Sequence, residues 1–231
     1  MSGLTTTLSP DGVEDLRLLI YGELVRTGRA PAVAELASSI GWTDAQVRRG
    51  LEALHGHRDV VLGPRHDIVM AHPFSTVPLG FSVMGDATLW WGGCAWDSFA
   101  IPHLLELDSP VLVATRCPAC QAPLAWNVGR HESPTGREIA HFLTPADRIW
   151  DDVVRSCTHQ QIFCSETCVD RWLEKTAHRR GYIMDLATVW RLSRGWYSGR
   201  LTRGYQRREP DAAAAYFAEV GLHGPFWGLD R

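Results

Sequence analysis

The N-terminal part of the chain carries apolar residues at helical spacing in three successive segments. A glycine closes each of the first two segments and a capping-box sequence begins the third, so three helices are expected. The expected helices cover residues 16–25, 32–39 and 43–54. Two short β-like runs, at residues 60–62 and 68–70, follow them. Three helices and a β-hairpin predict a winged-helix-like unit, which we assign to residues 1–75.

The pattern changes after this unit. Residues 73–80 contain two prolines and predict a linker. Apolar or alternating runs beyond it predict strands, with a polar loop at residues 129–138 and a helix at residues 168–176. The expected strands are 81–84, 88–91, 111–115 and 124–128. We therefore expect an α+β fold with a second domain over residues 76–208, followed by a C-terminal helix and tail over residues 209–231.

Composition and charge exclude several classes of protein. The chain has 231 residues, of which 45% are hydrophobic and 21% charged, and these values exclude a disordered, collagen-like or coiled-coil chain. Its apolar runs fall short of the roughly 18–20 residues that a membrane helix needs, and a secretory leader is not evident. The net charge of −3 gives no general attraction to nucleic acid or anionic lipid. We expect a soluble cytoplasmic protein.

The winged-helix-like unit raises the question of DNA binding. Seven arginines and nine acidic residues lie in residues 1–80, which gives a net charge of −2 (7 − 9). DNA binding requires a basic face because neutralisation of phosphates dominates the affinity. Arg48 and Arg49 on the third expected helix are too few to form one. Structural support or dimerisation is the favoured role, and DNA contact is the alternative.

Arginines are concentrated near the C-terminus. Eight lie between residues 179 and 208, namely Arg179, Arg180, Arg191, Arg194, Arg200, Arg203, Arg207 and Arg208. This pattern predicts a solvated helix face. A site for an acidic partner or an anionic thiol is the alternative.

The six cysteines carry the clearest chemical signal. All lie between residues 94 and 168, which favours reduced thiols with chemical or metal-binding roles over a disulfide framework. Cys94 follows a strand and two glycines and begins a short helix, where the helix dipole favours a thiolate. Asp97 shares its face, and a neighbouring thiolate and apolar tryptophans disfavour the ionised carboxylate. The pair offers a nucleophile beside a proton donor, although a small buried cysteine and an ordinary first-turn acid fit the same spacing.

A second cysteine lies close to a histidine. Cys157 stands at the expected start of a strand over residues 160–163, and His159 follows two positions later. Taken alone this pattern is weak, because a cysteine near a histidine is more often structural.

The remaining four cysteines form two closely spaced pairs. Cys117 and Cys120 have the spacing Cys-x2-Cys, and Cys164 and Cys168 have the spacing Cys-x3-Cys. Two such pairs are typical of a closed four-thiolate site for structural Zn(II). Two alternatives remain: these thiols carry a metal ion to another site, or they are free buried cysteines.

Residues 93–105, Gly-Cys-Ala-Trp-Asp-Ser-Phe-Ala-Ile-Pro-His-Leu-Leu, resemble the signature of the organomercurial (alkylmercury) lyases. The segment from Val154 through Cys157, His159 and Phe163 to Trp172 resembles a second motif of that family. The family also has a winged-helix-like unit before a mixed-sheet catalytic domain. The four-cysteine set departs from the family pattern, which has one cysteine near position 117.

The resemblance implies a role for each matched residue. Cys94 and Cys157 would be the paired mercury-binding thiolates, and Asp97 would protonate the mercury-bound carbon. Hydrocarbon and Hg(II) would be the products, no organic cofactor would be needed, and cellular thiols and a mercuric reductase would be the partners. Four aromatic residues are candidates for the walls of the substrate pocket or for plain core, namely Trp90, Trp91, Trp96 and Phe99.

Three functions remain in competition. The first is an organomercurial lyase with an added zinc site, favoured because Cys94, Asp97 and Cys157 are all present. The second is a family homologue recruited to a different, biosynthetic reaction. The third is a non-catalytic metal-binding regulator, which the acidic N-terminal unit disfavours.

Overall fold

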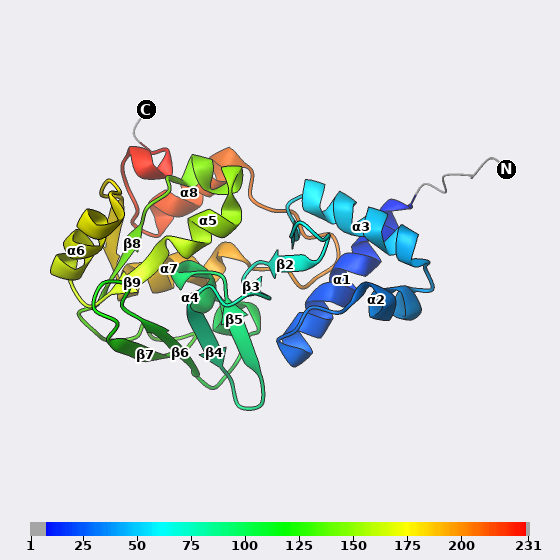
Figure 1. Cartoon of the computed structure of the whole chain (residues 1–231), viewed down its shortest axis with the longest axis horizontal. Coiled ribbons are helices and arrows are strands. Elements are labelled where there is room, and N and C mark those ends of the chain that lie inside the picture. The colour runs from blue at the N-terminus through cyan, green and yellow to red at the C-terminus, as the bar shows by residue number, and fades with distance from the viewer. Residues whose placement is uncertain (1–7, 230–231) are drawn as a thin grey trace.

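Three helices form one end of the molecule, α1 (Pro10–Thr27), α2 (Val33–Ile40) and α3 (Asp44–Gly56). This computed structural model describes residues 8–229, and Figure 1 shows the three helices grouped apart from the larger body. The sequence signals act as expected, because Gly28 and Gly41 end α1 and α2 in the left-handed conformation. Thr43 begins α3 by accepting the Gln46 N–H, and the Gln46 side chain accepts the Thr43 N–H. The three predicted helices are confirmed.

A sheet of seven strands follows the helices. Its strands are β1 (Val61–Leu62), β2 (Ile68–Ala71), β3 (Phe74–Ser75), β4 (Phe81–Met84), β5 (Leu89–Gly92), β6 (Val111–Arg116) and β7 (Pro123–Val128). They lie in the order β1-β2-β3-β5-β4-β6-β7, and all strand pairs of the described residues are antiparallel. The predicted hairpin β1–β2 is present and belongs to this large sheet. The winged-helix assignment and the division into domains stay predictions.

The predicted linker over residues 73–80 is wrong in its first half. Phe74 and Ser75 form β3, which pairs with β2 and β5. Both residues are buried, because the Phe74 ring enters the core. Burial of this ring outweighs the local signal of the two flanking prolines.

A smaller sheet and the remaining helices complete the α+β fold. Its strands lie in the order β10-β8-β9, with β8 (Ile139–Phe142), β9 (Gln160–Phe163) and β10 (Tyr182–Asp185). The helices are α4 (Ala95–Leu104), α5 (Val153–Thr158), α6 (Glu166–Thr176), α7 (Leu186–Trp196) and α8 (Pro210–Glu219), with 3-10 turns at Ala146–Asp151 and Pro225–Trp227. None of the helices among residues 8–229 is both long enough and apolar enough to cross a bilayer.

Helix α4 occupies the centre of this body. It contacts α7, strands β4 and β5 of the large sheet, and strand β9 of the small sheet. Of its ten residues, nine are buried and His103 alone is half-buried. A helix that is buried on nearly all sides lies inside the core of a larger fold. The sequence after Cys94 therefore has to form the core of the fold.

The sequence predicted a solvated face for the arginine-rich segment over residues 179–208. This prediction is wrong for Arg200. Arg200 is buried, and its Nε donates to the Tyr21 hydroxyl at 2.6 Å while its guanidinium lies over the Tyr197 and Tyr205 rings. Its second guanidinium nitrogen donates to the Asp59 carbonyl at 3.2 Å. The cation is tolerated inside because carbonyl groups and aromatic faces replace its water.

Substitution Arg200→Ala should lower the free energy of unfolding by about 3–5 kcal/mol, the range for removing one partner from a buried charged network. The Asp59 carboxylate lies 3.9 Å from the guanidinium and would remain without its cation. Arg207→Ala is the matched control, because Arg207 is exposed, and it should change stability by about 0.5 kcal/mol or less. Chemical denaturation measures the free energy of unfolding of both variants. Equally small losses in the two variants would contradict a stabilising role of Arg200.

Candidate functional site

Cys94 is the residue that begins helix α4. As the sequence predicts, it is the N-cap, and its Sγ accepts the Asp97 N–H at 3.4 Å. The preceding position requires glycine for a steric reason, because a Cβ at Gly93 would collide with the Asp97 carboxylate. A Cβ at Gly92 would likewise collide with Ser98. The two glycines therefore let β5 turn directly into α4 with the thiol and the acid on the same side.

Cys157 lies in a short helix and not at the start of a strand, so this part of the prediction is wrong. Asp152 accepts the Arg155 N–H and begins α5, and β9 starts three residues after Cys157. The capping carboxylate supplies the physical reason, because it stabilises one helical turn in a segment too short to show periodicity. The Cys157 side chain is 3% exposed.

The structure brings the three sequence-predicted residues together. Cys157 Sγ lies 3.7 Å from Asp97 Oδ2, and Cys94 Sγ accepts the Asp97 backbone N–H at 3.4 Å. Asp97 is 1% exposed and Cys94 is 2% exposed, so the group is enclosed by protein. Two thiols from distant segments and one carboxyl group thus share a single buried site.

Three further side chains complete the site, and the sequence analysis missed all of them. His72 Nε2 lies 3.8 Å from Cys157 Sγ, and the Tyr197 hydroxyl donates to Asp97 Oδ1 at 2.5 Å. Gln160 Oε1 accepts a hydrogen bond from Cys94 Sγ at 3.1 Å. Only Gln160 had a sequence signal, since it lies three positions after Cys157. His72 and Tyr197 are lone residues in unrelated segments.

The two thiols differ in acidity. The sequence predicted that the start of α4 favours a Cys94 thiolate, and this prediction is wrong. Burial outweighs the hydrogen bond from the Asp97 N–H and raises the pKa of the Cys94 thiol well above its ordinary value. The interaction with the Cys94 thiol and the contact with His72 lower the pKa of Cys157 in spite of its burial. Burial by itself lowers the pKa of His72, but Asp97 and Cys157 outweigh it and raise that pKa. Cys157 is therefore the thiol that ionises first, with the imidazolium of His72 as its counter-ion.

Each candidate pocket residue has a packing contact of its own. The Trp90 indole N–H donates to the Leu24 and Val25 carbonyls at the end of α1, both at 3.1 Å. Trp91 lines a surface groove beside α1 and α2. Phe99 packs edge-on against Trp126. Trp96 lies in a cluster of aromatic rings with Phe142, Trp196, Phe217 and Trp227. A role of these residues as substrate walls stays a prediction.

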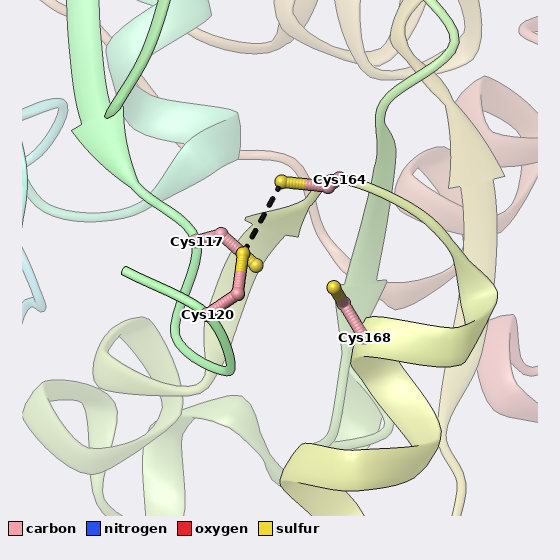
Figure 2. A group of neighbouring side chains, drawn as sticks. All are labelled: Cys117, Cys120, Cys164 and Cys168. Atoms are coloured by element: carbon pink, nitrogen blue, oxygen red, sulfur yellow. Dashed lines mark hydrogen bonds between the residues drawn. The ribbon is translucent and has the colours of Figure 1, made fainter. Parts of the chain in front are cut away.

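The other four cysteines form a second cluster, shown in Figure 2. Cys117 and Cys120 come from the turn between β6 and β7, Cys164 follows β9, and Cys168 lies on α6. Their sulfur atoms all lie within 4.8 Å of one another, and those of Cys120 and Cys164 are 3.6 Å apart. A tetrahedral ion with metal–sulfur bonds of about 2.3 Å would need sulfur atoms about 3.8 Å apart. The cluster can hold a metal ion.

One thiol of this cluster is already acidic. Burial opposes ionisation of Cys117, but hydrogen bonds from the backbone N–H groups of Cys120, Cys164 and Ala119 lower its pKa to about 7. A thiolate is the form of cysteine that binds metal ions. The backbone around the cluster therefore favours the ligand form of at least this sulfur.

Comparison with known proteins gives matches of two kinds. Residues 74–198 match the family model described as "MerB: Alkylmercury lyase". A solved structure described as "Crystal structure of the mercury-bound form of MerB2" aligns with a TM-score of 0.59 and 19% identity, over 81% of this chain and 90% of that chain. At this identity the alignment shows a common fold. A search of curated proteins gives no match.

The difference in acidity predicts an order of thiol modification. Near neutral pH, iodoacetamide should alkylate Cys157 faster than Cys94, because the thiolate is the reactive form. In His72→Gln, the pH at which Cys157 reacts at half its maximal rate should rise, since the counter-ion that favours the thiolate is lost. Peptide mass spectrometry after timed labelling measures both rates across a pH series.

His131→Gln is the control for this experiment. His131 is exposed, so the same substitution there should leave the pH dependence of Cys157 unchanged. Faster labelling of Cys94 in the unmodified chain would contradict the assigned order.

Proposed function

The chain belongs to the alkylmercury lyase family, and on that basis we propose that it breaks carbon–mercury bonds of organomercurial compounds by protonolysis. The observation that carries the proposal is the convergence of Cys94, Cys157 and Asp97 in one buried site. Soft thiolates select soft metal ions, and a carboxylic acid supplies the proton that a carbon leaving group needs. A buried site keeps water from competing for that proton.

We propose Cys157 as the first thiolate to bind the substrate. It attacks the mercury of an organomercury–thiol adduct, and the cellular thiolate leaves with its electron pair. His72 lies 3.8 Å from the sulfur and stabilises the Cys157 thiolate before the attack. The resulting bond joins mercury to Cys157 while the carbon–mercury bond remains intact.

Cys94 then becomes the second thiolate ligand. Its proton passes to the carboxylate of Asp97, whose backbone N–H donates to the Cys94 sulfur. Two thiolates increase the electron density on the mercury-bound carbon. The Asp97 carboxyl group then gives its proton to that carbon, and the electron pair of the carbon–mercury bond becomes the new carbon–hydrogen bond. Hydrocarbon leaves, and Hg(II) remains on the two sulfurs.

Tyr197 positions the acid in this scheme. Its hydroxyl holds Asp97 Oδ1 at 2.5 Å, which leaves Oδ2 on the side of Cys157. The aromatic cluster around Trp96 adjoins Asp97 in the chain, and we propose that such rings receive the organic group. Cellular thiols, and a mercuric reductase where one is present, would remove the Hg(II).

The N-terminal helices are proposed to support the site and not to contact DNA. Tyr21 of α1 lies within hydrogen-bond distance of the His72 carbonyl, at 3.1 Å. Arg17 of α1 is buried and donates to the Arg200 and Thr202 carbonyls at 2.6 and 2.7 Å. Two of the long side chains of α1 are thus committed to the rest of the fold, in keeping with a structural role for the unit assigned to residues 1–75.

We propose Zn(II) as the resident ion of the four-cysteine cluster. Zn(II) favours four thiolate ligands in a tetrahedron, and the two short spacings and sulfur separations suit that geometry. Bound there, the ion would cross-link two segments of the chain in a structural role. The cluster also favours one competing function, a family homologue recruited to a different reaction, because it departs from the family's usual cysteine pattern.

Purified protein in excess thiol should release benzene from phenylmercury, as measured by gas chromatography. Cys94→Ser should abolish turnover, and Asp97→Asn should slow it by about 10²–10⁴-fold, the usual worth of a general acid. Tyr197→Phe should lower kcat about 10- to 100-fold, since one hydrogen bond to a charged group is worth about 1.5–3 kcal/mol.

Asp86→Asn is the matched control, because Asp86 is exposed, and it should leave turnover unchanged. No benzene from the fully reduced, zinc-loaded chain would remove the mercury assignment. That result would favour the recruited homologue.

Elemental analysis of protein purified without chelator should find one equivalent of zinc per chain. Cys168→Ser should reduce that content, because a tetrahedral site loses one of four ligands. Protein that contains no zinc and takes none up would show that the four-thiolate assignment is wrong.

A further inference from the structure

The two thiols of the site lie in segments next to different sheets. Cys94 lies two residues after the end of β5 in the large sheet, and Cys157 lies three residues before the start of β9 in the small sheet. Within the described residues, no strand of one sheet pairs with a strand of the other. The distance between the two sulfurs therefore depends on how the sheets are held against each other.

The four-cysteine cluster spans the same two sheets. Cys117 follows β6 of the large sheet without an intervening residue, and Cys164 follows β9 of the small sheet in the same way. Figure 2 shows the turn with Cys117 and Cys120 facing Cys164 and Cys168 across the space between the two segments. Each sheet thus supplies one closely spaced pair of thiols.

We propose that a metal ion on these four thiolates clamps the two sheets together and thereby sets the separation of Cys94 from Cys157. This inference rests on the proposed function and on the proposed zinc ion. The ion would bind at the four-cysteine cluster and would position Cys94 and Cys157 without contacting them.

Strand β9 is the rigid link between the two sites. All four of its residues are buried, and Gln160 at its start accepts the hydrogen bond from Cys94 while Phe163 at its end adjoins Cys164. Three steps along a strand span about 10 Å, and an extended backbone within a sheet transmits position over that length. β9 is an edge strand of its sheet and pairs with β8 alone, so no strand pairing holds its other side to the large sheet.

The test compares Cys117→Ser/Cys120→Ser with the matched control Ala119→Ser. The control adds a serine to the same turn and removes no thiol. Three quantities are measured: zinc content, hydrogen exchange of the β9 amides, and cross-linking by dibromobimane, which joins two neighbouring thiols. Tryptic peptide 66–116 contains Cys94 as its single cysteine, and fragment ions identify its partner within peptide 156–171.

The control should retain one zinc per chain and the cross-link between Cys94 and Cys157. Hydrogen exchange of its β9 amides should remain slow. The double variant should lose the zinc and the cross-link, and exchange should become faster in β9 but not in α1. Its kcat for phenylmercury should fall about 10- to 100-fold, the usual loss when the residues that hold a metal-binding side chain in position are removed.

Two results would overturn the proposal. A zinc-free double variant that keeps the cross-link and slow exchange would show that the cluster does not position the pair, as expected of a site that only transfers metal. A double variant that keeps its zinc would show that the ligands are misassigned. If the double variant does not fold, zinc is removed from the unmodified chain with a chelator and then restored. The cross-link must then fall and return.

The cross-linking arm also separates this inference from the proposed reaction, because it requires no turnover. Unmodified protein that fails to release benzene but loses its cross-link on zinc removal would refute the lyase and keep the clamp.

Discussion

Enclosure of an acid beside two thiols is the constraint on which the rest of this structure depends. Asp97 is 1% exposed, and a buried carboxyl group is tolerated only when protein groups replace its water. The Tyr197 hydroxyl donates a hydrogen bond to Asp97 Oδ1, and Cys157 Sγ lies close to Asp97 Oδ2. Because every partner comes from a different segment, the site exists only when α4, α5 and α7 pack correctly. The requirement for a dry site thus becomes a requirement on the whole fold.

Support for this site extends outward through Arg200. The guanidinium lies over the Tyr197 ring, and its Nε reaches the Tyr21 hydroxyl, which in turn lies beside the His72 carbonyl. A single buried cation thus touches a positioning group for the acid and a helix that contacts the backbone of His72. This arrangement explains why an arginine lies inside the protein, where desolvation would otherwise be costly. It also joins the N-terminal helices to the chemistry without any direct contact with the thiols.

The sequence located much of the fold and three of the six candidate site residues. Capping and left-handed glycines are local signals, so the ends of α1 and α2 and the start of α3 followed from a few neighbouring residues, whereas α1 begins six residues before its predicted start. The pairing of Cys94 with Asp97 was equally local, because one helical turn separates them. Sequence reasoning failed where a distant contact outweighed the local pattern: burial of Phe74 made a strand from an expected linker, and Asp152 made a helix around Cys157.

The residue spacings by themselves determined two features: the helix that begins at Cys94 and carries Asp97, and the two closely spaced cysteine pairs. Each feature depends on residues only a few positions apart. Only the tertiary structure decided which cysteine is the more acidic and how the acid is held. His72 lies 85 positions from Cys157, and Tyr197 lies 100 positions from Asp97. No local pattern encodes such contacts, because they arise from the packing of elements that are remote in the chain.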